Sequence, residues 1–322
     1  MKLNVCCAYK HVHPRATPSM AAQYFRQKDK VVFIMGPTGT GKSRLAIDLA
    51  TRYPAEIINC DKIQVHRGLD VVTNKVTKEE CRGIPHHLLG TLDPKVDLTA
   101  DEFTVHASGL IDSLVMRGRL PIVVGGSTSY IQALATSNAE SRLRYDCCFL
   151  WVDVSMPILY SFVSRRVDRM VQGGLVEEVR NVFDFNNHDY SQGIRRAIGV
   201  PELDFFFRNE AFFNEENRAR VLDNAISKIK ENTCLLAYRQ LQKISRLHSQ
   251  WYWSMHRLDA TEVFLRSGDD ADEAWEKLVA GPSASIVNHF LRNPGLVPSL
   301  LTASEMGKSA ALRAMVASAG SR

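Results

Sequence analysis

The residues with the clearest capacity for chemistry form the stretch GPTGTGKS at positions 36–43. This stretch fits the pattern G-x-x-x-x-G-K-[ST] without a mismatch. Its glycines let the backbone wrap an anion, and the start of the helix that follows adds partial positive charge. The lysine supplies a fixed charge, and the serine hydroxyl is a ligand for Mg²⁺. The sequence therefore predicts a phosphate-binding loop made of Gly36, Pro37, Thr38, Gly39, Thr40, Gly41, Lys42 and Ser43.

A carboxylate is predicted beside this loop. Asp61 ends the apolar stretch AEIINCD, which follows the helix of the phosphate loop. Because the carboxyl ends of parallel strands line the ligand crevice, Asp61 should face the same cleft as Lys42. A structural alternative is that Asp61 only caps the next turn. Asp153, in FLWVDV, could instead help to hold Mg²⁺, which keeps a kinase or NTPase function open.

The elements that must position these residues alternate between strands and helices. Strands are predicted at residues 30–36, 55–61, 118–126 and 147–154, and helices at 42–53 and 101–117. This order predicts an α/β fold of the P-loop-containing nucleoside triphosphate hydrolase type, a parallel sheet wound by helices. Residues 158–181 and 215–248 have helical patterns, so the second half should be mainly helical. We expect a P-loop core at 30–155, a mainly helical part at 156–280 and a weakly ordered tail at 281–322.

The composition indicates the cellular compartment more clearly than it indicates the function. The 322 residues carry a net charge of +5, which suits either an anionic small substrate or a nucleic acid. Seven cysteines without a CxxC pair favour a reducing compartment. No apolar run approaches the ~20 residues that a bilayer crossing needs. Residues 1–28 are basic and lack acids, which is typical of an organelle transit peptide, with a disordered leader at 1–29 as the alternative.

Longer motifs resemble a known family. CDKIQVHRGLDVVTNKVT at residues 60–77 and IPHHLLG at 84–90 resemble the isopentenyltransferases, which include the tRNA dimethylallyltransferases. GRLPIVVGGSTSYI, RRVDRMVQGGLVEEV and AIGVPE continue the resemblance in order, so that it spans residues 30–259. LRYDCCFLWVDVS, AISKIKENTCLLAYRQLQKI and HRLDATEVF are similar to the plant adenylate isopentenyltransferases, which make cytokinins. The resemblance implies transfer of a dimethylallyl group from dimethylallyl diphosphate to N6 of ATP or ADP.

The resemblance also assigns roles to residues. The phosphate loop would hold the diphosphate of the prenyl donor, with Mg²⁺ on Ser43, and Thr38 would bond the bridging oxygen. Asp61 would be the general base and would orient N6. Gln64 would line the adenine pocket or act only as a loop scaffold, and Ser127 would lie near the substrates. Arg166, which falls in the family-like RRVDRM, and Arg196 are candidates for further phosphate clamps as the diphosphate leaves, although some arginines of that stretch would lie only on a helix surface.

The acceptor phosphates need further cations. Lys228 and Lys230 are candidates, although their spacing on an ideal helix lets at most one point straight into a shared pocket. Lys62, Lys75 and Arg239 are further candidates, and a solvated helix face explains any of these lysines equally well. His86 and His87 are interpreted as packing or pocket residues, because adjacent histidines rarely share one metal ion.

Three other functions stay open. The nearest is a tRNA dimethylallyltransferase that modifies an anticodon-loop adenosine, but no cysteine pair follows Cys234 to form the zinc finger that eukaryotic members often carry. The others are a small-molecule kinase and a phosphate-binding regulatory module without catalysis. We expect small-molecule substrates only, no nucleic acid, no membrane and a monomer. A plastid is the expected location, with the mitochondrion and the cytosol as alternatives.

Overall fold

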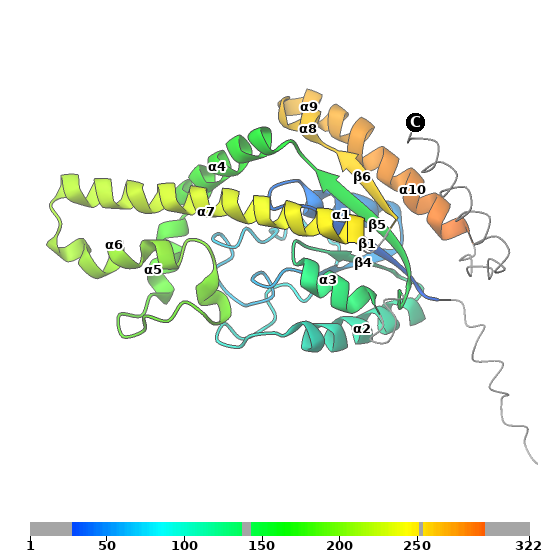
Figure 1. The fold of residues 1–322 in the computed structure, drawn as a ribbon, viewed down its shortest axis with the longest axis horizontal. Coiled ribbons are helices and arrows are strands. Elements are labelled where there is room, and N and C mark those ends of the chain that lie inside the picture. The colour runs from blue at the N-terminus through cyan, green and yellow to red at the C-terminus, as the bar shows by residue number, and fades with distance from the viewer. Residues whose placement is uncertain (1–27, 137–142, 251–253, 294–322) are drawn as a thin grey trace, which may run out of the picture.

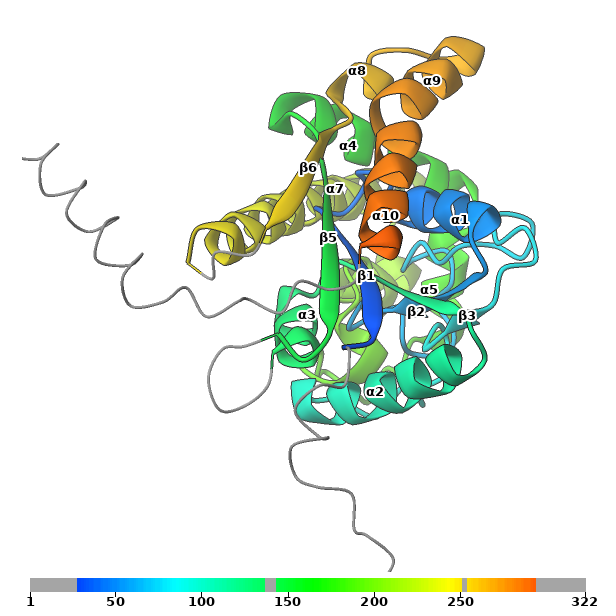
Figure 2. The same ribbon diagram turned by 90° about the vertical axis from the view of Figure 1, so that its right-hand side faces the viewer.

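The computed structural model describes residues 28–136, 143–250 and 254–293. Residues 1–27 of the leader predicted at 1–29, and residues 294–322 of the predicted tail, lie outside the described residues. A six-stranded parallel sheet forms the centre, in the order β3-β2-β4-β1-β5-β6 (Figures 1 and 2). Its strands are β1 (Lys30–Met35), β2 (Ala55–Asn59), β3 (His86–His87), β4 (Leu120–Val124), β5 (Asp146–Asp153) and β6 (Met255–Asp259). The predicted α/β class is confirmed.

Helices cover both faces of the sheet. The apolar side chains of β1 alternate between two cores, because successive residues of a strand point to opposite faces. One core holds α1 (Lys42–Arg52), α9 (Gly268–Trp275) and α10 (Gly281–Arg292), and the other holds α2 (Ala100–Met116) and α3 (Thr128–Ala135). α2 begins at a capping box between Thr99 and Glu102. Figure 2 shows α1 and α10 on the opposite side of the sheet from α2 and α3.

A helical extension projects from one end of the sheet (Figure 1). It contains α4 (Met156–Gln172), α5 (Leu175–Val182), α6 (Asp204–Asn209) and the first half of α7 (Glu215–Gln250). A third core joins these helices to the loop after β2 through Val72, Val167, Leu203, Phe206 and Ile229. The second half of α7 returns to the sheet, where Ile244 and Leu247 join the core of α2 and α3. This one helix therefore connects the extension to the sheet.

The predicted boundaries differ from the structure in three places. The helix expected at 158–181 is divided at Gly173 and Gly174 into α4 and α5. The P-loop core is not confined to 30–155, because β6 pairs with β5 and α8 (Thr261–Phe264), α9 and α10 continue from it. The weakly ordered tail is wrong for Gly281–Arg292, which form α10 after a π-helical turn at Glu276–Ala280.

Helix α10 is ordered because it has a buried face. Pro282 stands in its first turn, where a missing N–H costs little, and Ser283 and Val287 are fully buried. Tyr53 donates a hydrogen bond to the carbonyl of Ala284, and Lys30 donates to that of Phe290. Among the described helices, none combines the length and the apolar character that a membrane crossing requires.

Candidate active site

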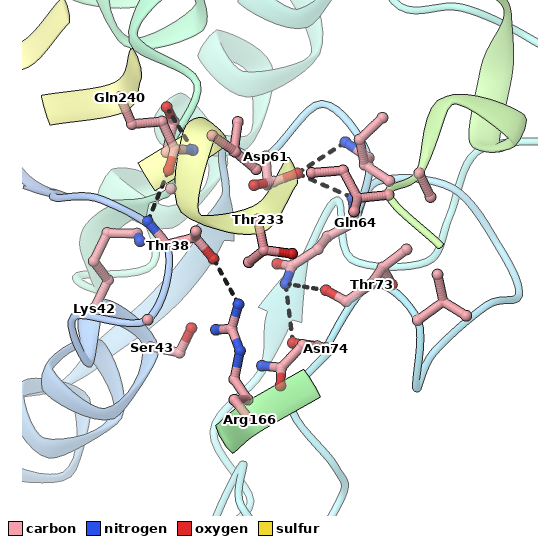
Figure 3. Close-up of a pocket in the computed structure, with 18 of the residues that line it drawn as sticks. Thr38, Lys42, Ser43, Asp61, Gln64, Thr73, Asn74, Arg166, Thr233 and Gln240 are labelled. Carbon is pink, nitrogen blue, oxygen red and sulfur yellow. Dashed lines mark hydrogen bonds between the residues drawn. The ribbon is translucent and has the colours of Figure 1, made fainter. Parts of the chain in front are cut away.

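A pocket of about 430 Å³ lies at the carboxyl ends of β1, β2 and β4, where α4 and α7 close over them (Figure 3). The phosphate loop forms one wall and the loop after β2 forms another. Of the residues singled out in the sequence, this pocket is lined by Thr38, Gly39, Gly41, Lys42, Ser43, Asp61, Gln64, Arg166 and Arg196. The apolar part of the lining consists of Ile63, Val72, Val124, Phe162, Met170, Ala197, Ile198, Ile229 and Leu236. The pocket therefore offers both anion-binding groups and an apolar surface.

The phosphate loop has the conformation that its glycines predict. Gly41 has a φ of 91°, which side-chain-bearing residues rarely adopt, and a Cβ there would lie 2.8 Å from the ring of Trp275. Thr40 is buried and donates to the carbonyl of Pro37, so its side chain stabilises the loop from below. Gly36, Pro37 and Thr40 do not line the pocket. They shape the loop rather than face a ligand.

Lys42 is a poorly solvated cation in this loop. Its ammonium donates to the carbonyl of Pro37 at 2.7 Å. Burial lowers the pKa of Lys42 to about 8, the carboxylate of Asp61 raises it, and the positive charge of Arg166 lowers it. An anionic ligand would relieve both the desolvation and the repulsion. The phosphate loop is therefore expected to bind anions.

Arg166 and Thr38 face each other across the pocket (Figure 3). The Arg166 guanidinium donates from Nη2 to Thr38 Oγ1 at 3.0 Å. Because Thr38 Oγ1 accepts this bond, its own hydrogen is left to donate to a ligand oxygen. The buried Arg166 Nε has no partner in the described part of the chain, and burial together with Arg169 lowers the pKa of Arg166 to about 10. An unpaired buried donor beside a phosphate loop indicates a phosphate contact.

Asp61 combines the two roles that its sequence allows. Its Oδ1 accepts hydrogen bonds from the backbone N–H groups of Ile63 at 2.9 Å and Gln64 at 3.2 Å. This capping fixes the carboxylate, and among the described residues Oδ2 has no hydrogen-bond partner. The carboxylate faces the pocket (Figure 3). Oδ2 is therefore placed to accept a proton or a hydrogen bond from a ligand.

Gln64 and Ser127 hold the loops around Asp61. Gln64 donates from Nε2 to the carbonyls of Thr73 and Asn74, each at 3.0 Å, while the residue still lines the pocket. Ser127 Oγ accepts from the backbone N–H of Lys62 at 3.0 Å but does not line the pocket. Gln64 therefore holds the loop in the way that the scaffold alternative expected. Ser127 holds the loop of Asp61 through its hydrogen bond with Lys62, outside the pocket.

The structure does not bring every predicted cation to the pocket. Arg196 lines it, but its guanidinium also donates to Asp97 at 2.5 Å. Lys230 lies outside the lining and pairs with Asp168 at 2.5 Å, and Lys228 is exposed on α7. Lys62 is also outside the lining: its ammonium lies 4.9 Å from the centroid of the Tyr130 ring, and burial and the charges of Arg196 and Lys243 lower its pKa. The structure therefore does not place Lys228 or Lys230 as a ligand of phosphates bound in this pocket.

The structure also shows the contacts of Asp153 and of the two adjacent histidines. Asp153 accepts from Arg257 at 2.6 Å and is not part of the pocket lining, so it is not placed as the metal carboxylate of an NTPase. His87 Nε2 donates to the carboxylate of Glu56 at 2.8 Å, and His86 contacts the carbonyl of Ile84. Both histidines belong to the edge strand β3, in agreement with a packing role.

Magnesium would need the donors that this pocket offers. Among the described residues, no group of three or more His, Cys, Asp or Glu side chains could hold a metal ion by itself. Mg²⁺ at a phosphate site takes most of its ligands from the phosphates and from water, so one or two protein oxygens suffice. Ser43 lines the pocket at the start of α1, and its hydroxyl fits that requirement.

Gln240 is a site residue that sequence reasoning missed. It is buried on α7, accepts from the backbone N–H of Thr38 at 2.7 Å and donates to the carbonyl of Gly126 at 3.4 Å. A Cβ at Gly126 would lie 2.2 Å from Gln240 Nε2, so a larger residue there would displace the amide of Gln240. The signal was present: Thr233 and Gln240 are the polar members of an otherwise apolar stripe with Ile229, Ala237 and Ile244.

Replacing Gln240 by leucine should loosen the phosphate loop. The Thr38 N–H would lose its acceptor in a buried place, which costs about 1–3 kcal/mol of folding free energy. We expect a lower midpoint in urea unfolding and a higher KM for the ligand of the phosphate loop. Gln242→Leu is the matched control, because Gln242 is exposed on the same helix. Equal behaviour of the two variants would contradict the link between α7 and the loop.

Binding at Lys42 should depend on pH. The ammonium form attracts an anion, so affinity for a diphosphate should be high below pH 8 and fall as the pH rises through about 8. Between pH 7 and pH 9 the loss should reach about tenfold, measured by titration calorimetry with a diphosphate ligand. Lys42→Arg keeps its charge over this range and should flatten the profile. An equally steep profile in that variant would assign the titration to another group.

Comparisons with known proteins show the family of this chain. The IPP transferase family model matches residues 64–143 and 135–246. Adenylate isopentenyltransferase 5, chloroplastic, from Arabidopsis thaliana is 65% identical over 270 residues, which cover 83% of this chain and 82% of the relative. Adenylate isopentenyltransferase 7, mitochondrial, from the same plant is 58% identical over 273 residues, covering 84% and 83%.

Solved structures share the fold. A eukaryotic dimethylallyltransferase acting on tRNA has a TM-score of 0.72 at 22% identity, covering 82% of this chain and 79% of that one. The full-length tRNA isopentenylpyrophosphate transferase from Bacillus halodurans has a TM-score of 0.63 at 24% identity, covering 81% and 100%. At these identities the likeness concerns the fold, whereas the curated relatives establish the family. The chain is a member of the IPP transferase family and an isopentenyltransferase of the plant adenylate type.

Proposed function

We propose that this enzyme transfers the dimethylallyl group of dimethylallyl diphosphate to N6 of the adenine of ATP or ADP, the first step of cytokinin biosynthesis. The observation that carries the proposal is one pocket in which a phosphate loop and the free oxygen of Asp61 face a shared apolar surface. Relatives that are 58–65% identical are named adenylate isopentenyltransferases, which favours an adenine nucleotide over tRNA as acceptor.

In this reaction the bond between the allylic C1 and the diphosphate oxygen breaks, and a bond between N6 and C1 forms. The N6 proton passes to Asp61, whose Oδ1 is held by the backbone and whose Oδ2 is left to accept it. The amine is a poor nucleophile because its lone pair is delocalised into the ring. A fixed carboxylate therefore both orients N6 and removes the charge that builds on it.

The diphosphate leaves with negative charge. Lys42, the backbone N–H groups of Gly39 and Gly41, and Arg166, which all line the pocket, would stabilise that charge. The Thr38 hydroxyl, oriented by Arg166, can donate to the bridging oxygen. Ser43 would hold Mg²⁺, which when bound neutralises part of the charge on the phosphates.

The prenyl chain and the adenine need the apolar wall of the pocket. Ile63, Val72 and Met170 come from the Asp61 loop and α4, and Ile229 and Leu236 come from α7. Exclusion of water by these side chains protects an allylic centre that would otherwise be hydrolysed. The names of the relatives support a plastid as the location, with the mitochondrion as the alternative. The monomeric state stays a prediction.

Transfer of label tests the proposal. The enzyme is incubated with dimethylallyl diphosphate labelled in the prenyl group, Mg²⁺ and one acceptor: ATP, ADP, AMP or unmodified tRNA. We expect label on ATP or ADP and equimolar release of diphosphate. Label on tRNA alone would make the protein a tRNA dimethylallyltransferase, and loss of the γ-phosphate of ATP without prenyl transfer would make it a kinase.

A further inference from the structure

A second cavity opens on the other side of the phosphate loop. It has a volume of about 800 Å³ and lies between α4, α8 and α9, which Figures 1 and 2 both show clustered beside one another. Gly39, Gly41, Arg44 and Phe162 line both this cavity and the first pocket. The phosphate loop therefore lies between the two cavities, so that a phosphate chain bound to it would border both of them.

The second cavity is rich in positive charge. Arg44, Arg165, Arg169 and Arg266 line it, and Asp168 is the acidic residue among them. Asp168 is paired with Lys230 at 2.5 Å, Arg44 with Asp272 at 2.7 Å, and Arg266 with Glu262 at 2.9 Å. Within the described parts of the chain, Arg165 and Arg169 have no carboxylate partner. Because they stand four residues apart on α4, they lie on one face of that helix.

Aromatic rings complete the lining. Phe162 and Phe264 meet edge to face with 4.7 Å between ring centroids, and the Arg169 guanidinium lies 5.4 Å from the Phe162 centroid. Trp275 packs against Gly41, and the Arg44 guanidinium lies over the Trp275 ring, 4.6 Å from its centroid. Aromatic and guanidinium planes are surfaces on which a nucleobase stacks. The volume is within the range of pockets that take a nucleotide-sized ligand.

We propose that this cavity is a second site for nucleoside triphosphates, which bind with their terminal phosphates on the phosphate loop and their base beside Phe162 and Phe264. Glycine-rich loops of this pattern hold the β- and γ-phosphates of nucleotides. The inference rests on the proposed function, in which the same loop holds the donor diphosphate. A nucleoside triphosphate in this orientation presents no amine to Asp61, excludes dimethylallyl diphosphate and inhibits transfer.

GTP is the probe, because guanine has a carbonyl oxygen in place of the amine at C6 and cannot accept the prenyl group there. Initial rates are measured with dimethylallyl diphosphate varied, ADP fixed and Mg·GTP added, and then with ADP varied. We expect GTP to compete with dimethylallyl diphosphate. The double variant Arg165→Gln, Arg169→Gln should raise the inhibition constant of GTP at least about tenfold, with the donor KM changed less than about twofold.

Arg220→Gln is a single-charge control, because Arg220 is exposed on α7, away from the residues that line the second cavity. It removes one positive charge and should leave the inhibition by GTP unchanged. Inorganic tripolyphosphate separates the phosphate contribution from that of the nucleoside, and we expect it to inhibit less than GTP. Equal inhibition by both would overturn the base site.

Competition of GTP with ADP alone, or an inhibition constant unchanged in the double variant, would overturn the second site. A fluorescent N-methylanthraniloyl GTP analogue gives a readout that needs no transfer. Its displacement by a non-reactive thiolo analogue of dimethylallyl diphosphate should occur in the wild-type protein, and its binding should weaken in the double variant. Absence of prenyl transfer would count against the proposed function, whereas transfer without GTP binding would count against this inference only.

Discussion

Asp61→Asn is expected to lower kcat for dimethylallyl transfer by about 10²–10⁴-fold, with both KM values changed only a few-fold. The amide oxygen of asparagine can still accept the backbone hydrogen bonds that Ile63 and Gln64 give to Oδ1, so the loop keeps its conformation. What is lost is the basic oxygen that takes the N6 proton. The measurement is a rate at saturating donor and acceptor, with circular dichroism and urea unfolding to confirm an intact fold.

Asp61→Ala separates catalysis from structure. It removes the proton acceptor and also the cap of the turn. Its free energy of unfolding, measured in urea, should therefore be lower than that of Asp61→Asn by about 1 kcal/mol or more. The two variants should nevertheless lose similar amounts of kcat. If Asp61→Asn retained most of the wild-type rate, the carboxylate would be a structural cap and the base would have to be sought elsewhere in the pocket.

Lys42→Met should have the second largest effect, and on a different step. Removal of the charge that faces the departing diphosphate is expected to lower kcat/KM for the donor by about 10²–10³-fold. The KM of the acceptor should change little, because in this account the acceptor phosphates lie elsewhere. Burial that lowers the pKa of Lys42 to about 8 also means that the uncharged methionine fits the site without loss of folding stability.

Lys78→Met is the control for this variant, since Lys78 is exposed in the loop before β3 and lies outside the pocket lining. It should leave both KM values unchanged. If Lys42→Met raised the acceptor KM instead and spared the donor, the phosphate loop would be holding the nucleotide in the productive complex, as in a kinase.

Local sequence was sufficient for the parts of the site that one motif specifies. The phosphate loop and the position of Asp61 after an apolar strand follow from patterns within a few residues, and the presence of Arg166 in the pocket follows from the family resemblance, whereas its hydrogen bond to Thr38 was not predicted. The direction of Asp61 could be predicted because carboxyl ends of parallel strands share one edge.

Features that depend on distant pairing were not predicted. β6 reads MHRLD, and of its residues only Leu258 is buried, so no strand pattern marks it; its pairing with β5 is tertiary. Gln240 reaches the phosphate loop from a point more than two hundred residues later in the chain. Lys230 was predicted as a ligand of the acceptor phosphates because it is a lysine, but its ammonium forms an ion pair with the carboxylate of Asp168 on α4. Composition alone suggested weak order for α10, although Val287 and Phe290 give it an apolar face.

The most direct test of the central claim is a crystal structure of the enzyme with ADP and the thiolo analogue of dimethylallyl diphosphate. The account predicts the diphosphate of the analogue on Lys42 and Arg166, its sulfur beside Thr38, and the adenine N6 within about 3 Å of Asp61 Oδ2. Phosphates of ADP on Lys42, with the adenine away from Asp61 and the analogue bound elsewhere, would contradict it.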